Sequence, residues 1–213
     1  MSDHLITAPT DDLASRIAAR SLSQREANYA NEVRRLLDAG RAVMGRSGVG
    51  TRPRVADIVA AAGLSNDVFY RHFPSKDALV AAITADGTER LHSYLAHQMS
   101  KEATASGRVR RWVAGVLSQA DDGTAEVTRA VLWNAGSVGE EIVSGPPSAA
   151  NRLSTLLGGP FRELGSAEPE FAATLAAHAT VGKLSEYLAQ GVRPSGDDVD
   201  RITEFCLRSA QCT

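Results

Sequence analysis

The sequence predicts an all-α fold of about nine helices. Apolar residues recur at helical spacing along most of the 213 residues, and no run alternates apolar and polar residues as a half-buried strand would. Clusters of glycine and proline separate these periodic segments. With 43% hydrophobic and 23% charged residues, the composition is that of an ordinary globular chain rather than a disordered one.

The first predicted helix covers residues 23–46. An apolar stripe runs along one side, whereas Arg34 and Arg35 fall on the other, so the helix is amphipathic. Residues 1–22 are expected to form a flexible N-terminal arm. The glycine-rich segment 45–50 ends the helix, and because no strand precedes it and no Lys-Ser/Thr follows it, a helix stop is favoured over a phosphate-binding loop.

Two short helices follow, at residues 54–62 and 66–72. Between them, Gly63 suits the left-handed position that ends a helix, and Ser65 suits the cap that begins one. Two helices joined by a three- or four-residue turn containing glycine form a helix-turn-helix, whose second helix can enter the DNA major groove. A helical hairpin that serves only the fold is the alternative.

The polar side of the second short helix carries residues that can bond to nucleic acid: Asn66, Asp67, Tyr70, Arg71 and His72. Asparagine can bond adenine, aspartate can accept from cytosine, and arginine can pair with guanine. Tyrosine and histidine are suited to phosphate oxygens. This side chain set favours the DNA-binding interpretation of the helix pair.

A fourth helix is predicted at residues 76–100, capped by Ser75. Lys76 in its first turn is suited to phosphate, and the helix N-terminus adds backbone N–H groups and a favourable dipole. Five further helices are predicted at residues 109–120, 124–135, 148–164, 168–190 and 197–211.

The net charge of -2 conceals an uneven distribution. Residues 20–76 carry a net charge of +5, whereas residues 77–213 carry -5 and residues 1–19 carry -2. A basic head on an acidic body is typical of a module that meets a polyanion. A charged surface that is merely solvated is the alternative.

Three motifs occur in order in the basic segment: D-I-V-A-A-A-G-L-S at 57–65, F-Y-R-H-F at 69–73 and S-K-D-A-L at 75–79. With the helix before them, they closely resemble the N-terminal DNA-binding domain of the TetR family of bacterial transcriptional regulators. The resemblance implies a homodimer that binds a palindromic operator and usually represses until a small-molecule effector binds. It implies a DNA-binding domain at residues 23–76 and an effector-binding and dimerisation domain at 77–213.

The resemblance carries Tyr70, His72 and Lys76 over as backbone contacts, and it makes Asn66, Asp67 and Arg71 the candidate base-reading set. The complete expected DNA-binding surface consists of Arg54, Ser65, Asn66, Asp67, Tyr70, Arg71, His72 and Lys76. Arg54 stands where many members have threonine, so it becomes a candidate phosphate contact and the helix cap is expected from elsewhere, such as Thr51. Asp67-Val68 stand where the family often has Gly-Thr, which removes one hydroxyl contact to phosphate.

The body, from residue 85 on, matches nothing so specific. The family would pair the last two long helices of two subunits into a four-helix bundle, as the dimer interface. Candidate pocket residues are Tyr94, Met99, Trp112, Trp133, Asn134 and His178. A largely apolar cavity lined by them would suit an uncharged or weakly polar ligand, whereas packing in the core is the competing role of the tryptophans and methionine.

The sequence contains no arrangement that predicts an enzyme, a metal site or a cofactor. Residues 136–139 lack the first glycine of a nucleophile elbow, and His92 and His97 do not share a helix face. Cys206 and Cys212 also fall on different faces, so no disulfide is expected. Because neither a secretory signal nor a membrane-spanning run is evident, a reducing cytoplasm is the simplest compartment and no membrane partner is expected.

Two other functions stay open at the level of sequence. One is an activator or ligand-independent regulator on the same fold. The other is a helical small-molecule-binding protein or enzyme whose helix-turn-helix no longer binds DNA. The basic segment and the intact set of Tyr70, His72 and Lys76 argue against the second.

Overall fold

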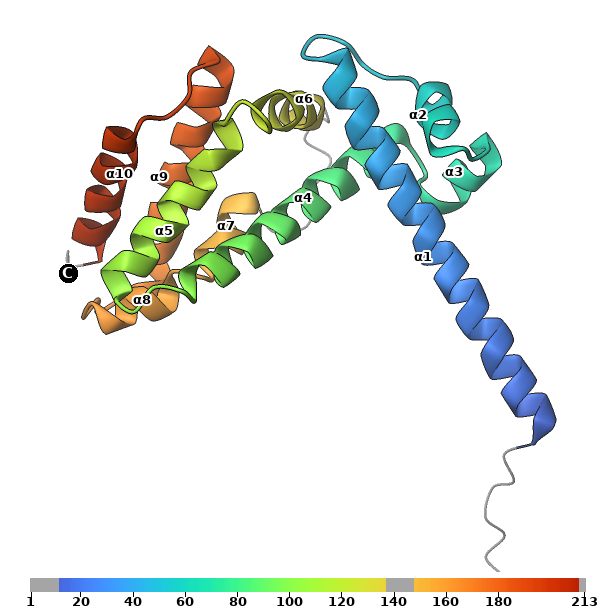
Figure 1. Ribbon diagram of the computed structural model, residues 1–213, viewed down its shortest axis with the longest axis horizontal. Helices are drawn as coiled ribbons and strands as arrows, with labels where there is room; N and C mark the ends of the chain where they lie inside the picture. Colours follow the sequence, from blue (N-terminus) through green and yellow to red (C-terminus); the bar gives the residue numbers. More distant parts are fainter. Residues whose placement is uncertain (1–11, 137–147, 211–213) are drawn as a thin grey trace, which may run out of the picture.

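Helix α1, Leu13–Ser47, is the longest element of the computed structural model, which describes residues 12–136 and 148–210. The prediction placed residues 13–22 in a flexible arm, but they are helical and extend α1 beyond the expected start at residue 23. They are rich in alanine, leucine and arginine, which favour helix without any packing. Figure 1 shows this end of α1 projecting away from the rest of the molecule.

The head of the protein is formed by α2 (Val55–Ala62) and α3 (Asn66–His72), which pack beside the C-terminal half of α1. The next helix, α4 (Lys76–Met99), contributes its first turns to the same core. The largest side chains fully buried there include Leu36, Ile58, Phe69 and Leu79. The helix pair predicted from the sequence is therefore confirmed.

The body follows as a series of helices of unequal length. They are α5 (Ala105–Leu117), the short 3-10 helix Ser118–Ala120, α6 (Ala125–Gly136), α7 (Ala149–Ser154), α8 (Gly158–Glu163), α9 (Pro169–Gln190) and α10 (Gly196–Ser209). Trp112 lies fully buried at the centre of this second core, and its indole N–H donates to the carbonyl of Leu153 at 3.1 Å. That bond ties α5 to α7.

The all-α class is confirmed, and residues 12–136 and 148–210 contain ten α-helices and no strand. The single helix predicted at 148–164 is wrong, because α7 ends at Ser154 and α8 begins at Gly158. Pro160 lacks an N–H and is tolerated only in the first turn of a helix, so the helix has to restart near it. In these same ranges no helix combines the length and the apolarity needed to cross a bilayer.

Helix α4 takes part in both cores. Leu79, Val80 and Ile83 pack in the head, whereas Leu95 and Met99 pack in the body. Two residues of α6 also join the head core, so the head rests on the body through a second helix. The domain boundary predicted after residue 76 stays a prediction.

Candidate nucleic-acid interface

Helix α3 is fixed by a cap at its start and by one buried face. At its start, the Ser65 hydroxyl accepts from the backbone N–H of Val68 at 3.3 Å, which satisfies one of the free donors of the first turn. Phe69, fully buried, fixes the middle of the helix to the head core, and its ring meets Phe73 at 5.9 Å. The helix is therefore fixed by one face, and its other face is left open.

The open face of α3 carries four of the predicted DNA-contacting residues. Asn66, Asp67, Tyr70 and Arg71 are all exposed, and at 3.6 residues per turn they lie on one side of the helix. The set contains both donors and acceptors, with no aliphatic side chain among them. This is the composition suited to reading base edges rather than to packing against protein.

His72 does not belong to that face, and its prediction as a phosphate contact is wrong in this structure. Its side chain is 0% exposed, and Nε2 donates to the Glu32 carboxylate at 2.7 Å. The Tyr29 ring packs edge-on at 4.2 Å, and Nδ1 is buried without a partner among the described residues. Helical spacing contains the signal, since His72 lies three and four residues beyond Phe69 and Val68 on the inner face.

Glu32 of α1 interacts with basic side chains of both α1 and α3. The hydrogen bond from His72 lowers the pKa of its carboxyl below the ordinary 4.5, and the charges of Arg71 and Arg35 lower it further. The Arg71 guanidinium lies 4.0 Å from the same carboxylate while remaining 57% exposed. Arg71 is thus tethered loosely to α1 and still faces solvent.

Arg35 is a positioning residue that the sequence reasoning did not single out. From α1 its guanidinium donates to the carbonyl of Ala62 at 2.6 and 3.0 Å, and to that of Gly63 at 3.1 Å. These carbonyls end α2, where a cation is favoured by the helix dipole. Gly63 has φ +62°, and a Cβ there would lie 2.9 Å from the guanidinium, so this turn favours glycine twice over.

The start of α2 is capped by a residue inside the helix. The Asp57 carboxylate accepts from the backbone N–H of Arg54 at 3.2 Å and from its guanidinium at 3.3 Å, so the cap expected from Thr51 comes from Asp57 instead. The side-chain hydrogen bond from Arg54 lowers the pKa of Asp57. The Arg54 side chain is 82% exposed and remains open to a phosphate.

Lys76 begins α4 at the edge of the head. The Ser75 hydroxyl accepts from the Ala78 N–H at 3.1 Å, as the sequence predicts for a cap. Lys76 itself is half-buried. Its ammonium group forms no ion pair with any described acid.

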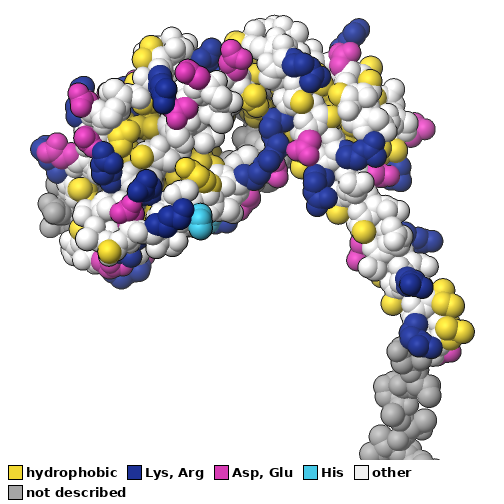
Figure 2. Space-filling model, viewed as in Figure 1, with side chains coloured by type: hydrophobic (Ala, Val, Ile, Leu, Met, Phe, Trp, Pro, Cys, Tyr) yellow, Lys and Arg dark blue, Asp and Glu magenta, His cyan; other side chains and the backbone are white. Residues whose placement is uncertain are grey.

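A cavity of about 520 Å³ lies between α4, α6, α7 and α9, with Arg41 of α1 also in its lining. Its walls are largely apolar and include Leu91, Val127 and Val181. Figure 2 shows a hollow between the body and α1 with basic side chains on its rim. A volume of this size is within the roughly 300–1,000 Å³ of small-molecule sites.

Of the six predicted pocket residues, Tyr94 alone is among the described residues that line this cavity. Met99 and Trp112 are buried in the body core, and Asn134 is buried with its amide donating to the Ala130 carbonyl. Trp133 is half-buried on α6. His178 is exposed on α9, where Nδ1 donates to the Thr174 carbonyl at 2.8 Å. Among the aromatic residues chosen from the sequence, Trp112 therefore packs the body core, whereas Tyr94 lines the cavity.

Two of the remaining features named from the sequence, most of segment 136–139 and Cys212, lie outside the described residues. Cys206 is a free, buried thiol near the Thr180 hydroxyl at 3.7 Å, and burial raises its pKa to about 11. No group of three metal-binding side chains occurs in the part of the chain that the structure describes.

An exposed polar helix set on a two-helix turn, in front of a helical body with a cavity, defines a helix-turn-helix protein. Residues 36–83 match the family model described as "Bacterial regulatory proteins, tetR family". Residues 36–83 therefore form the N-terminal domain of the TetR family, and the resemblance inferred from the motifs is confirmed. No curated protein matches the chain.

Solved structures share this fold over most of their length. A TetR-family transcriptional regulator from Pectobacterium atrosepticum is 18% identical, with a TM-score of 0.61 over 87% of this chain and 93% of that chain. Reduced NemR from E. coli is 17% identical, with a TM-score of 0.61 over 82% and 95%. FadR from Bacillus subtilis in complex with stearoyl-CoA is 15% identical, with a TM-score of 0.54 over 83% and 96%. At these identities the likeness establishes the fold, which is that of TetR-family regulators.

Proposed function

We propose that this protein is a homodimeric transcriptional repressor that leaves a palindromic operator when a small molecule binds its body. The observation that carries the proposal is the exposed polar face of α3, mounted on a domain that matches the TetR family. A helix with that face is suited to contact a polar partner. Its surroundings carry the positive charge that DNA requires.

In the proposed complex, α3 lies in the major groove. Asn66, Asp67 and Arg71 contact base edges, whereas Tyr70 and Lys76 contact phosphates. Arg54, and Ser65 at the start of α3, lie close to the DNA backbone in this complex. His72 acts through Glu32 by holding α3 against α1, so it is a positioning residue rather than a contact.

Dimerisation is proposed through α9 and α10. Leu184, Leu188 and Cys206 of these helices are consumed by the protomer's own core, but Phe171, Leu175 and Phe205 are 62%, 51% and 51% exposed. Large exposed apolar side chains on two neighbouring helices support a partner surface. A two-fold axis there would hold two copies of α3 about 34–36 Å apart, the spacing of successive major grooves.

The effector is proposed to occupy the cavity between α4, α6, α7 and α9. Its size and its apolar walls suit a small molecule, and one structural neighbour was solved with stearoyl-CoA. Because α4 and α6 also pack in the head core, a ligand between them is in contact with the helices that carry the DNA-binding domain. The ligand shifts the balance between two states only by its difference in affinity for them.

Selection of binding sites from random double-stranded DNA by the purified full chain tests the proposal. We expect a palindromic consensus whose half-sites lie one helical turn apart. Lys76→Ala should weaken binding to all sequences alike and flatten its salt dependence, whereas Asn66→Ala should change the preferred sequence. Lys101→Ala, an exposed lysine beyond the far end of α4, is the matched control and should leave both unchanged.

Two outcomes would overturn the assignment. Recovery of no consensus at all would place the protein among helical small-molecule-binding proteins that do not bind DNA. A consensus with an unaltered salt slope in Lys76→Ala would retain DNA binding but reject the docking of α3 and α4 described above.

A further inference from the structure

The charged residues that line the cavity are of one sign. Among the described residues of the lining, Arg41 and Arg90 carry formal charge and no carboxylate does. The remaining walls are apolar side chains, glycines, hydroxyls and the amide of Gln119. Among the hydroxyls, that of Thr84 donates to the Val80 carbonyl and that of Thr88 to the Thr84 carbonyl, each at 3.0 Å, so both are occupied. The cavity therefore offers an apolar interior with two guanidinium groups at one place in its wall.

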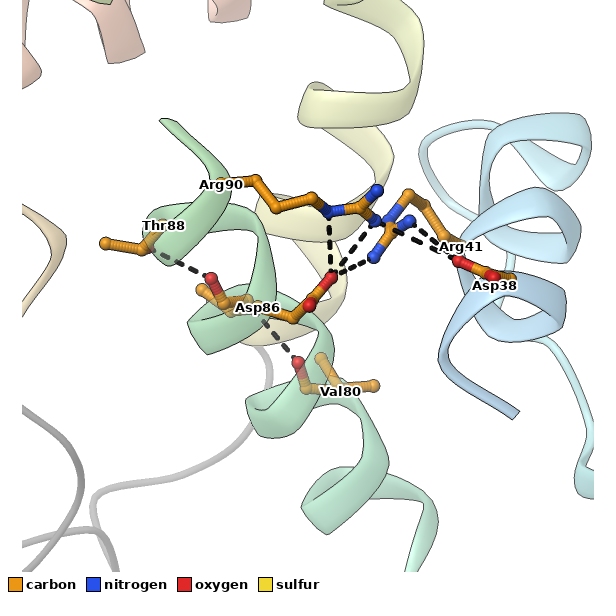
Figure 3. A network of polar contacts seen from close by, with 7 residues as sticks. Asp38, Arg41, Val80, Asp86, Thr88 and Arg90 are labelled. Carbon is orange, nitrogen blue, oxygen red and sulfur yellow. Dashed lines mark hydrogen bonds and ion pairs between the residues drawn. The ribbon is translucent and has the colours of Figure 1, made fainter. Parts of the chain in front are cut away.

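The two arginines converge on a single carboxylate behind them. Figure 3 shows the guanidinium groups of Arg41, from α1, and Arg90, from α4, meeting at Asp86. Arg41 Nη2 lies 2.5 Å from Asp86 Oδ2, and Arg90 Nε and Nη2 both lie 3.0 Å from the same oxygen. Asp38 takes a further bond from Arg41 Nη1 at 3.2 Å. Asp86 and Asp38 orient the guanidinium groups and are not themselves in the lining.

Donors remain on both guanidinium groups. An arginine has five N–H donors, and Nη1 of Arg90 and Nε of Arg41 form no hydrogen bond with the residues that the structure describes. The Nε atom of Arg41 is not buried without a partner, and Arg90 is an exposed residue, so both guanidinium groups are open to solvent or to a ligand. The Arg90 side chain is 57% exposed and that of Arg41 is 22% exposed. Arg90 is the more accessible of the two.

From this arrangement we infer that the effector is an amphiphilic anion: an apolar body that fills the cavity and a carboxylate that pairs with Arg90, with Arg41 beside it. A cationic ligand would meet two guanidinium groups and, among the described residues of the lining, no carboxylate. An uncharged ligand would leave the guanidinium donors to water. The inference rests on the proposed effector function and names the chemical class of that effector.

The same contact explains how the effector reaches the head. Asp86 of α4 joins α1 through its pair with Arg41, whereas its pair with Arg90 lies within α4, so a ligand carboxylate bound beside both arginines competes with Asp86 for Arg41. Competition loosens the bridge between α1 and α4, the helices that position α2 and α3. The ligand anion thus favours a state in which α1 and α4 are less tightly joined.

Matched pairs of probes test the class of ligand on the full chain by calorimetric titration. Decanoate is compared with decanol, and 4-phenylbutyrate with 4-phenylbutanol, so that each pair differs in the carboxylate alone. We expect the carboxylate of at least one pair to bind about tenfold more tightly than its alcohol, as a charge-assisted hydrogen bond allows. Failure of both carboxylates to bind, or equal binding of acid and alcohol in both pairs, overturns the inference.

Variants test the site. Arg90→Gln should reduce the preference for the acid to about threefold or less, whereas Asp86→Asn should strengthen acid binding because it removes the competing carboxylate. Arg110→Gln, which removes an arginine of α5 paired with Asp200 outside the cavity, should leave the preference intact. An unchanged preference in Arg90→Gln would reject the assigned contact even though anions bind.

The two proposals fail in different ways. A protein that selects an operator but shows no carboxylate preference retains the regulatory function and loses the anion class. A protein that binds decanoate through Arg90 but selects no DNA retains the anion site and loses the regulatory function. Release of the selected DNA by decanoate in the wild type, and not in Arg90→Gln, would join them.

Discussion

Replacing Arg35 by methionine removes the only side-chain cap on the end of α2 among the described residues, while it keeps an unbranched side chain of similar helix propensity. Three guanidinium bonds to the carbonyls of Ala62 and Gly63 are lost. Hydrogen bonds to a charged group contribute about 1.5–3 kcal/mol, but these carbonyls are partly exposed and regain water in the variant. We therefore expect the free energy of unfolding to fall by about 1.5–2 kcal/mol, near the lower end for the whole set.

Urea unfolding followed by far-ultraviolet circular dichroism measures this loss. For a chain of about 200 residues it corresponds to a Tm lower by about 3–8 °C, provided that protein concentration is held fixed because a dimer's Tm depends on it. Arg34→Met is the matched control: the neighbouring arginine is exposed and makes no hydrogen bond or ion pair with a described residue. A loss below about 0.5 kcal/mol in Arg35→Met, or an equal loss in both variants, would refute the capping role.

Three further predictions concern single groups. Ser65→Ala removes the acceptor of the Val68 N–H and should cost about 1 kcal/mol of unfolding free energy in urea; no measurable change would mean that water replaces this cap fully. In a chain whose other cysteine is serine, the buried Cys206, with a pKa of about 11, should resist Ellman's reagent at neutral pH until the protein is unfolded, and rapid native labelling would contradict that burial. The lowered pKa of Glu32 means that its carboxylate stabilises the fold above 4.5 and that this stabilisation is lost as pH falls through the folded value, so the stability gap between wild type and Glu32→Gln should shrink on acidification. A gap that persists unchanged to about pH 3.5 would show that the charge of the pair with His72 is irrelevant.

The helix-turn-helix could be predicted closely because its signals are local. Gly63 and Ser65 mark the end of one helix and the start of the next, and the predicted range 66–72 agrees with α3. The start of α1 could not be found from burial, since residues 13–22 are helical yet all exposed and belong to neither core. A pattern of apolar residues reports packing, and helix held by propensity alone gives no such pattern.

The candidate site was predicted in part for a similar reason. The face of α3, including the inward position of His72, follows from spacing within seven residues, whereas the partner of His72 is Glu32, forty residues earlier. The cavity depends on five helices, and its arginines were overlooked because a charged residue on an amphipathic helix is ordinarily solvated. Tryptophan drew attention in the body by its size, and size is what makes Trp112 a core residue instead.

Because α4 packs in both the head core and the body core, it couples the unfolding of the two. Its first turns belong to the head core and its last turns to the body core, within one continuous hydrogen-bonded helix of 24 residues. Melting the head would therefore strip one end of a helix that the body needs, and melting the body would strip the other. The two cores are expected to unfold in one cooperative transition. A substitution that destabilises the head should therefore lower the melting temperature of the whole chain.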